Sequence, residues 1–465
     1  MSLDINIKNG SYYDPADHVL KKGTIGIRHG QIVSVNEKKN VDTEITIDAS
    51  DALILPGFID VHAHLRDLDL SYKETFASGT RAAIHGGVTT LLCMPNTKPA
   101  VTRPSIFIDY INRARSAAYC NVGFLCGYPV EQADLKLLKD YGAFGIKLYL
   151  ERSLEGLDWS DDRLLEEALQ NIFEIGFPLH VHPGIPHSRE EDSLKFLELV
   201  QKQGFTPLQA FSLLYSDTME TASLERLFQL TSKIATANPS IKPRIHACHV
   251  SSALAIDKLL SWKERFPGTI TSEVTPHHLF LTNEMQFDND VVAKVQQPLR
   301  PASDATYLLQ KFLDGSIDMI VSDHAPHTAE EKMVPFIEAP SGFPVLDIYV
   351  PLLLTCFLQR QIPISEVIRG CCEAPAAYLG VASKKGLIKK GADADLIIVR
   401  QVNPYTPLTD NYQSQSRISP YESAGLTLEW EVTHVIVNGE LQIEDGVMVG
   451  QPNNRLLLNR RIPLK

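Results

Sequence analysis

Two histidines separated by a single residue are the first indication of a chemical function in this chain. His62 and His64 follow the apolar run 52–59, and an apolar run of this length between polar residues is typical of a buried strand. Because residues two apart on a strand point to the same side, the two imidazoles are predicted to lie together where the strand ends. Imidazole is a common ligand of zinc and related divalent metals. Arg66 follows two positions later, where it is placed to bind an anion near a metal.

A lysine within an apolar segment is the second chemical signal. Lys147 lies in the run 143–149, between Ile146 and Leu148. One interpretation is a lysine that buries its stem and keeps its amine in water. The other is a desolvated amine, whose pKa falls on burial so that it becomes nucleophilic. A neutral lysine of this kind can take up carbon dioxide to form a carbamate.

Eight short apolar runs alternate with helical stretches, which is the pattern of a parallel β/α fold. The runs are 53–61, 88–94, 122–126, 143–149, 177–181, 244–248, 269–274 and 317–322. Helices are expected between most of them, for example over 72–85 and 104–118, with two or three helices in the long stretch 183–243. Eight strands favour an α/β fold of the closed (β/α)8 TIM-like barrel type.

Both ends of the chain have a different texture, with short strands separated by tight turns such as Asn9-Gly10 and Asn438-Gly439. We therefore predict one small β-sandwich domain formed from residues 1–55 plus 380–465, and a barrel over residues 56–379. Active sites of such barrels lie at the carboxyl ends of the strands.

The polar residues of interest do follow the predicted strands. They are His62, His64, Asn96, Lys147, His180, His182, His246, His249, Asp323 and His327. Taken singly, a histidine at a strand end can be a packed core residue, and Asp323 can cap the next helix. Taken together they indicate a site, because buried charges are costly unless they are paired or bound to a metal.

Bulk properties exclude several classes of function. The chain has 465 residues and a formal net charge of -12, and no long basic run is present, which argues against nucleic acid or an anionic membrane as partners. The N-terminus has no signal-peptide pattern, and no apolar run approaches the roughly 20 residues of a membrane span. The 7 cysteines include no CxxC pair and are interpreted as buried thiols. A cytoplasmic location is expected.

Several separated motifs occur in an order that is found in a known enzyme family. They are 60–66, 73–80, 86–90, 93–99, 145–150, 246–250, 273–281 and 322–332. On these motifs the chain resembles the amidohydrolase superfamily, and within it the dihydroorotases of the type found as a domain in the animal multifunctional pyrimidine protein. The resemblance covers the barrel and, more loosely, the β domain.

The resemblance implies a site with two divalent metal ions, with zinc as the default. His62, His64 and Asp323 would hold one ion, His182 and His249 the other, and a carbon dioxide-derived carbamate on Lys147 would bridge them. Asp323 would also be catalytic, because it would take a proton from a hydroxide shared by the two ions and pass it to the leaving nitrogen. Arg66, Asn96 and His327 would bind the carboxylate of a small-molecule substrate.

The implied reaction is the reversible cyclisation of N-carbamoyl-L-aspartate to L-dihydroorotate in de novo pyrimidine biosynthesis. The alternatives are another cyclic amidohydrolase, of the hydantoinase or allantoinase type, and an inactive homologue that scaffolds a transcarbamoylase. The pair Arg66 and Asn96 argues against the first, and the complete ligand set argues against the second. A homodimer and an association with aspartate transcarbamoylase are the protein partners that the resemblance suggests.

The sequence departs from the family pattern at four places. Asp67-Leu68-Asp69 replaces Glu-Pro-Gly after the arginine, and Pro183-Gly184 replaces Ala-Glu after the fifth strand. Gln296-Gln297 stands where relatives have Asn-Pro, and His180 is an alternative to His182 as the metal ligand. Three residues of the motif 273–281 are given no direct catalytic role, namely Glu273, His277 and His278.

Overall fold

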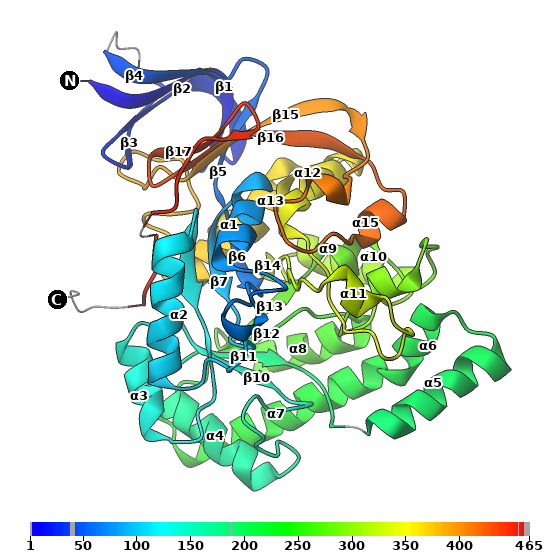
Figure 1. The fold of residues 1–465 in the computed structure, drawn as a ribbon. Coiled ribbons are helices and arrows are strands. Elements are labelled where there is room, and N and C mark those ends of the chain that lie inside the picture. Colours follow the sequence, from blue (N-terminus) through cyan, green and yellow to red (C-terminus); the bar gives the residue numbers. More distant parts are fainter. Residues whose placement is uncertain (1, 38–41, 187, 454, 460–465) are drawn as a thin grey trace.

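The chain folds into a parallel barrel with a β domain above it, as Figure 1 shows for the computed structural model. The structure describes residues 2–37, 42–186, 188–453 and 455–459. Within these residues, no helix is both long and apolar enough to cross a membrane.

The barrel strands are parallel neighbours in two hydrogen-bonded segments, a three-stranded and a six-stranded one. They are β6 (Phe58–Ala63), β7 (Val88–Cys93), β8 (Asn121–Phe124), β9 (Cys126–Gly127), β10 (Ile146–Tyr149), β11 (Leu179–His182), β12 (Ile245–Ala247), β13 (Ile270–Val274) and β14 (Met319–Ile320). β8 and β9 form one strand interrupted at Leu125, so the ring has eight strands. A parallel bridge between Ala63 and His324 closes the ring between β6 and β14. The prediction of a (β/α)8 barrel is confirmed.

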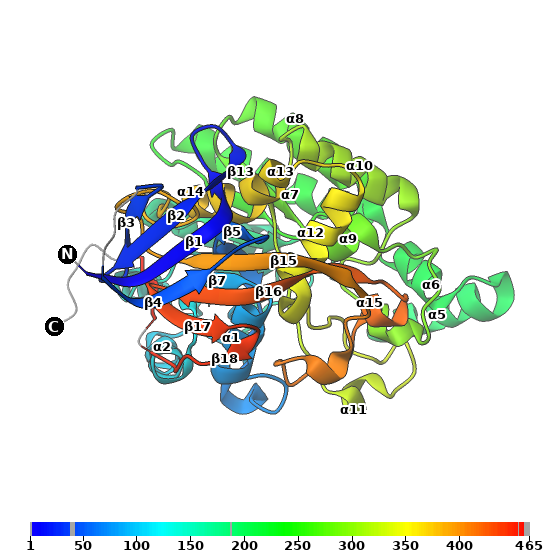
Figure 2. The same cartoon turned by 90° about the horizontal axis from the view of Figure 1, so that it is seen from above.

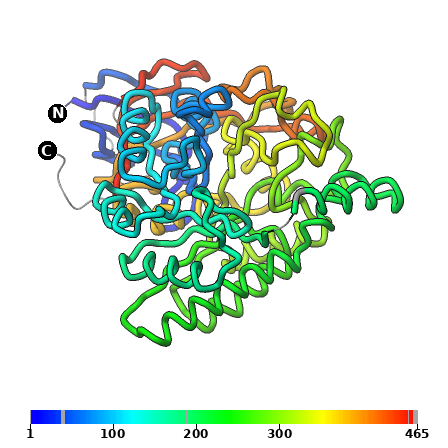
Figure 3. Tube along the Cα trace, turned by 60° about the horizontal axis from the view of Figure 1, so that its bottom comes forward, coloured from blue at the N-terminus to red at the C-terminus, as the bar shows by residue number. Residues whose placement is uncertain are grey.

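Helices surround this ring. They are α1 (Phe76–His85), α2 (Pro104–Ala117), α3 (Ala133–Asp140), α4 (Asp162–Ile175), α5 (Arg189–Gln203), α6 (Pro207–Leu214), α7 (Asp217–Ala237), α8 (Ala253–Arg265), α9 (Pro276–Phe280), α10 (Ala302–Leu313), α11 (Ala329–Lys332), α12 (Tyr349–Gln359), α13 (Ile364–Ile368), α14 (Ala374–Tyr378) and α15 (Pro420–Ser423). Single turns occur at η1 (Leu68–Leu70), η2 (Asp290–Ala293), η3 (Leu346–Ile348), η4 (Arg369–Glu373) and η5 (Thr409–Asn411). α5, α6 and α7 fill the long stretch where two or three helices were predicted, on the side away from the β domain (Figure 3).

The helix predicted over 72–85 begins later, at Phe76. Thr75 is its N-cap, and the Thr75 hydroxyl accepts a hydrogen bond from the backbone N–H of Ser78. The Ser78 hydroxyl in turn accepts from the backbone N–H of Thr75, which completes a capping box. Residues 72–74 therefore belong to the loop above the barrel, which frees Lys73 to face the site.

The β domain is one nine-stranded sheet that combines both ends of the chain. Its strands are β1 (Leu3–Asp14), β2 (Val19–Arg28), β3 (Gln31–Val35), β4 (Thr43–Asp48), β5 (Leu53–Pro56), β15 (Leu396–Tyr405), β16 (Leu428–Val437), β17 (Glu440–Glu444) and β18 (Val447–Met448). Figure 2 shows the blue N-terminal and orange-red C-terminal strands side by side. The sheet folds over a core of its own, to which Ile25, Ile54 and Ile398 contribute from different strands. The exact domain boundaries stay a prediction.

The single strand predicted over 53–61 is wrong, because Gly57 divides it. β5 pairs with β1 and β15 in the β domain, whereas β6 pairs with β7 in the barrel. The backbone N–H of Gly57 donates to Asp395 O at 2.8 Å, and a Cβ at Gly57 would lie only 2.1 Å from Thr89 Oγ1. The chain thus passes from one sheet to the other at a point with no room for a side chain.

Candidate metal centre and substrate cavity

A cavity of about 610 Å³ opens at the carboxyl ends of the barrel strands. All the predicted site residues except Lys147 line it, namely His62, His64, Arg66, Asn96, His182, His249, Asp323 and His327. Lys147 is buried in β10. The eight lining residues come from β6, β7, β11, β12 and β14 and from the loops that follow these five strands. Their individual roles stay predictions.

Three of these residues form a ligand set suited to one metal ion. Asp323 Oδ1 lies 3.3 Å from His62 Nε2 and 3.2 Å from His64 Nε2. Two ligands of a tetrahedral zinc ion, each about 2.0–2.1 Å from the metal, are themselves about 3.3 Å apart. These two distances and the donor types therefore fit a zinc ion.

A second pair of histidines faces the same space. His182 Nδ1 and His249 Nε2 are 2.9 Å apart, and the outer nitrogens of both rings have no hydrogen-bond partner among the described residues. Burial lowers the pKa of both imidazoles well below the usual range, which favours neutral rings. Neutral imidazole is the form that binds metals.

The amine of Lys147 is also without a hydrogen-bond partner in the described part of the chain. Its Nζ is buried and lies 5.3 Å from the centre of the Tyr149 ring. A buried charged amine with no acceptor is costly. The site therefore fits a lysine that carries a further group, such as a carbamate, better than a bare ammonium.

Glu273, which sequence analysis named without a direct catalytic role, contacts one of the predicted metal ligands. One of its carboxylate oxygens contacts His62 Nδ1, and the other lies 2.7 Å from His246 Nε2. The backbone N–H of His249 donates to the same carboxylate at 3.2 Å. Burial alone would raise the pKa of Glu273, but the two imidazoles hold it well below the usual range. Glu273 thus fixes the orientation of one predicted ligand and the backbone of another. Its place at the end of the seventh strand was the available signal.

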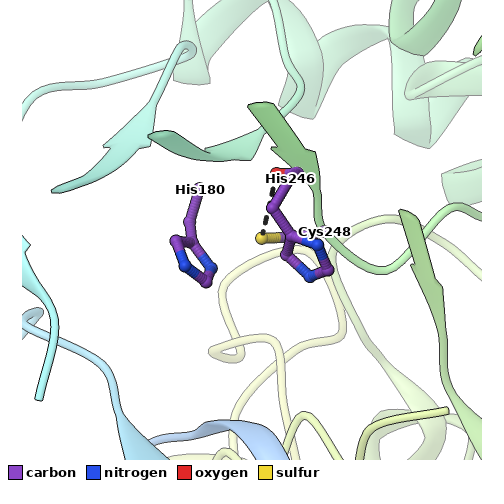
Figure 4. A group of neighbouring side chains, drawn as sticks. All are labelled: His180, His246 and Cys248. Atoms are coloured by element: carbon purple, nitrogen blue, oxygen red, sulfur yellow. Dashed lines mark hydrogen bonds between the residues drawn. The ribbon is translucent and has the colours of Figure 1, made fainter. Parts of the chain in front are cut away.

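Figure 4 shows His180, His246 and Cys248 grouped inside the barrel. The Tyr378 hydroxyl lies 2.8 Å from His180 Nε2, and His246 contacts Thr271 and Glu273 through its two ring nitrogens. Both nitrogens of His246 are engaged, whereas His180 Nδ1 has no hydrogen-bond partner among the described residues. The geometry favours His182 over His180 as the metal ligand, since His182 lines the cavity.

Asn96 connects the histidines to the substrate end of the cavity. Its side-chain oxygen lies 2.6 Å from His64 Nδ1, so that nitrogen carries the proton and Nε2 is left free to face Asp323. The amide nitrogen of Asn96 remains available as a donor into the cavity. One side chain therefore orients a predicted metal ligand and serves the predicted carboxylate site.

Arg66 is buried beside His327, with 3.4 Å between Arg66 Nη2 and His327 Nε2. Arg66, Asp67 and Leu68 all have left-handed backbone conformations, with φ of 55°, 57° and 50°. Such conformations cost about 1–3 kcal/mol each for residues other than glycine, and they persist at functional sites where neighbours hold them. The arginine loop is therefore a constrained segment.

The Asp67 carboxylate is what holds this loop. It accepts hydrogen bonds from the backbone N–H of Leu68 at 2.7 Å and of Phe76 at 3.1 Å, and from Arg113 at 3.2 Å. The departure from Glu-Pro-Gly at this point thus comes with its own anchor for Arg66.

The other two departures contact each other. Gln297 donates to the backbone oxygen of Pro183, and Gln296 donates to Glu151 at 3.3 Å. A Cβ at Gly184 would lie 2.9 Å from the Cβ of Glu151, so the glycine leaves room for that carboxylate. Glu151 Oε1 lies 3.9 Å from His182 Nε2. Glu151 and Gln296 line the cavity next to the second histidine pair.

Comparison with known proteins adds an independent observation. The model of the amidohydrolase family matches residues 53–441. The dihydroorotase of Clostridium acetobutylicum is 32% identical over 447 residues, which covers 95% of this chain and 100% of that protein. The dihydroorotase of Pyrococcus horikoshii is 32% identical over 441 residues, which covers 94% and 92%.

Solved structures with the same fold include hydantoinases. The L-hydantoinase of Arthrobacter aurescens superposes with a TM-score of 0.86 at 22% identity, covering 98% of this chain and 99% of that one. The D-hydantoinase of a Thermus species superposes with a TM-score of 0.82, also at 22% identity and with the same coverage. At this identity the likeness concerns the fold.

Proposed function

Because this chain belongs to the amidohydrolase family and is a metal-dependent hydrolase, we propose that it is a dihydroorotase. It would interconvert N-carbamoyl-L-aspartate and L-dihydroorotate, and ring closure would be the direction used in de novo pyrimidine biosynthesis. One observation carries the proposal: Arg66, Asn96 and His327 line the same cavity as the histidine and aspartate cluster. A cyclic amide with a carboxylate substituent matches this arrangement, and curated relatives named dihydroorotases support it.

The proposed metal ligands are His62, His64 and Asp323 for one ion and His182 and His249 for the other. Lys147, as a carbamate, would bridge the two ions, and zinc suits this donor set. When bound, two such cations would supply Lewis acidity for water and for the ring amide carbonyl.

Asp323 is the proposed general acid and base. Burial raises the pKa of this carboxyl. A carboxyl group with a raised pKa accepts a proton more readily, which suits transfer of a proton from the attacking water to the leaving ring nitrogen. In ring closure the same carboxyl would act in the reverse order.

Arg66 is proposed to bind the substrate carboxylate in a bidentate manner. Asn96 and His327 flank it and would donate to the same group. A neutral cyclic amide makes none of these contacts, so the three residues favour an acidic substrate over a plain hydantoin or dihydrouracil.

A substrate panel tests the proposal. Zinc-supplemented enzyme is expected to hydrolyse L-dihydroorotate and to close N-carbamoyl-L-aspartate, and to act poorly on hydantoin, dihydrouracil and allantoin. In Arg66→Ala the loss should appear mainly as a higher KM. Turnover of dihydrouracil with none of dihydroorotate would show a hydantoinase-type enzyme instead. A metal content under about one ion per chain would favour the inactive scaffold, since a complete two-metal site retains its ions.

We also propose a cytoplasmic homodimer that associates with an aspartate transcarbamoylase. This part rests on the resemblance to dihydroorotases. Light scattering of the purified protein, alone and mixed with the transcarbamoylase, tests both associations.

A further inference from the structure

Each of the two ring nitrogens of His327 has one hydrogen-bond donor and one hydrogen-bond acceptor as a neighbour. At Nδ1, the Lys73 ammonium lies at 3.2 Å and the Glu331 carboxylate at 3.1 Å. At Nε2, the backbone oxygen of Ser341 lies at 3.1 Å and Arg66 Nη2 at 3.4 Å. Each nitrogen therefore meets one group that can only donate and one that can only accept.

A neutral imidazole carries one proton, so it can donate at one nitrogen and accept at the other, but it cannot do both at each nitrogen. With the proton on Nε2, the ring donates to Ser341 O and accepts from Lys73. With the proton on Nδ1, it donates to Glu331 and accepts from Arg66, and the Nε2 lone pair then faces the Ser341 oxygen. The contacts of the first tautomer are 3.1 and 3.2 Å, against 3.1 and 3.4 Å for the second.

The doubly protonated ring is disfavoured. Burial lowers the pKa of His327 far below its usual range, and the Arg66 guanidinium and the Lys73 ammonium lower it further. The choice is therefore between the two neutral tautomers. Lys73 is the only one of the four neighbours that makes Nδ1 an acceptor.

Lys73 is itself held in place. Its ammonium forms an ion pair with Glu331 at 2.8 Å, and its side chain lines the cavity. Glu331 Oε1 also accepts from the Tyr72 hydroxyl, and Glu331 Oε2 accepts from the backbone N–H of Thr328. These bonds occupy the carboxylate with other donors, which weakens its competition for the Nδ1 proton.

We propose that Lys73 is a positioning residue that keeps the proton of His327 on Nε2. The N–H then points to the cavity wall at Ser341, where an incoming substrate carboxylate would take it over beside Arg66. Without Lys73, Glu331 would draw the proton to Nδ1, and Nε2 would present a lone pair to the carboxylate. The consequence for substrate binding rests on the proposed function, whereas the tautomer does not.

Nitrogen NMR of the histidine rings tests the tautomer in the substrate-free holoenzyme, with the His327 signals assigned from the His327→Gln variant. The wild-type protein should show a protonated Nε2 and a bare Nδ1. Lys73→Met should exchange these two states, and Lys73→Arg should keep the wild-type pattern. Lys136→Met, on the exposed face of α3, is the matched control and should leave the His327 ring unchanged. An unchanged ring in a folded Lys73→Met protein would overturn the proposal.

Kinetics supply the second readout. In Lys73→Met, KM for dihydroorotate should rise by about tenfold or more while kcat changes by less than about threefold, since one hydrogen bond to a charged group is lost. Lys73→Arg should recover most of the loss. An enzyme that does not act on dihydroorotate but shows the tautomer exchange would remove the proposed function and leave the assignment of Lys73. An active dihydroorotase that shows no tautomer exchange would support the proposed function and overturn the assignment of Lys73.

Discussion

The side-chain oxygen of Asn96 lies 2.6 Å from Nδ1 of His64, so a residue expected to bind substrate also orients a residue expected to bind metal. The two halves of the site are therefore coupled through one amide. A substitution in the substrate-binding half should therefore alter metal binding, and a substitution in the metal-binding half should alter substrate binding.

Asn96→Ala should weaken both functions at once. Loss of the hydrogen bond to His64 is expected to lower zinc affinity by about tenfold or more, as is usual for partners of metal-ligating histidines. KM for the carboxylated substrate should rise in parallel. Zinc retained after dialysis against a chelator and steady-state kinetics measure the two effects. Asn112→Ala, on the exposed face of α2, is the control. A higher KM with unchanged zinc retention would contradict the coupling.

Glu273→Gln should reduce activity by about 10- to 100-fold through the orientation of His62. The amide can still contact His62 and His246, but it offers only one acceptor oxygen in place of two. Metal content by mass spectrometry, together with kcat, tests this. Full activity with full zinc occupancy would show that His62 needs no carboxylate partner.

Lys147→Met should abolish the carbamate and with it the second metal site. The wild-type protein, incubated with ¹³C-labelled bicarbonate and zinc, is expected to give a carbamate carbon signal that Lys147→Met lacks. Activity should fall together with the metal content. An active wild-type enzyme that shows no such signal would mean that the lysine is not carboxylated.

Lys332 is not one of the proposed metal ligands, and it allows the pH dependence of protein stability to be tested. Burial lowers the pKa of this lysine to about 7, with a contribution from nearby Lys294. Between the folded pKa near 7 and the unfolded value of 10.5, the unfolded state binds more protons, so the wild-type protein gains stability as pH rises through this window.

Lys332→Met removes that dependence. The Tm of Lys332→Met minus the Tm of wild type should therefore be highest at pH 7 and below. This difference should decrease as pH rises from about 7 toward about 10. Thermal unfolding of both proteins over this range measures the trend, and Lys136→Met on the exposed face of α3 is the control. A Tm difference that does not change with pH would show that Lys332 is charged in the folded protein.

The barrel could be predicted because its strands are short apolar runs separated by amphipathic helices, a pattern that local sequence records directly. The division at Gly57 is not predicted, although Pro56-Gly57 is a turn dipeptide, because the lack of room for a side chain depends on Thr89 in a neighbouring strand. A tertiary contact of this kind leaves no mark on the spacing of residues.

The candidate site shows the same contrast. The pair His62 and His64 could be read from a two-residue spacing. Glu273 could not be assigned, because its partner His62 is 211 positions away along the chain. In the sequence Lys73 stands out only as a member of the motif 73–80, and its contact with His327 spans 254 positions. Side chains that act through another residue are visible only once the loops are assembled.

The pairing of β5 with β15 has a consequence for how the protein is made. Ile54 lies opposite Ile398, so one edge of β5 has no partner until the ribosome has synthesised nearly the whole barrel. Unpaired strand edges are templates for association with other chains. The newly made N-terminal strands therefore depend on late-arriving residues to cover them, and a chain truncated before β15 would leave this edge open.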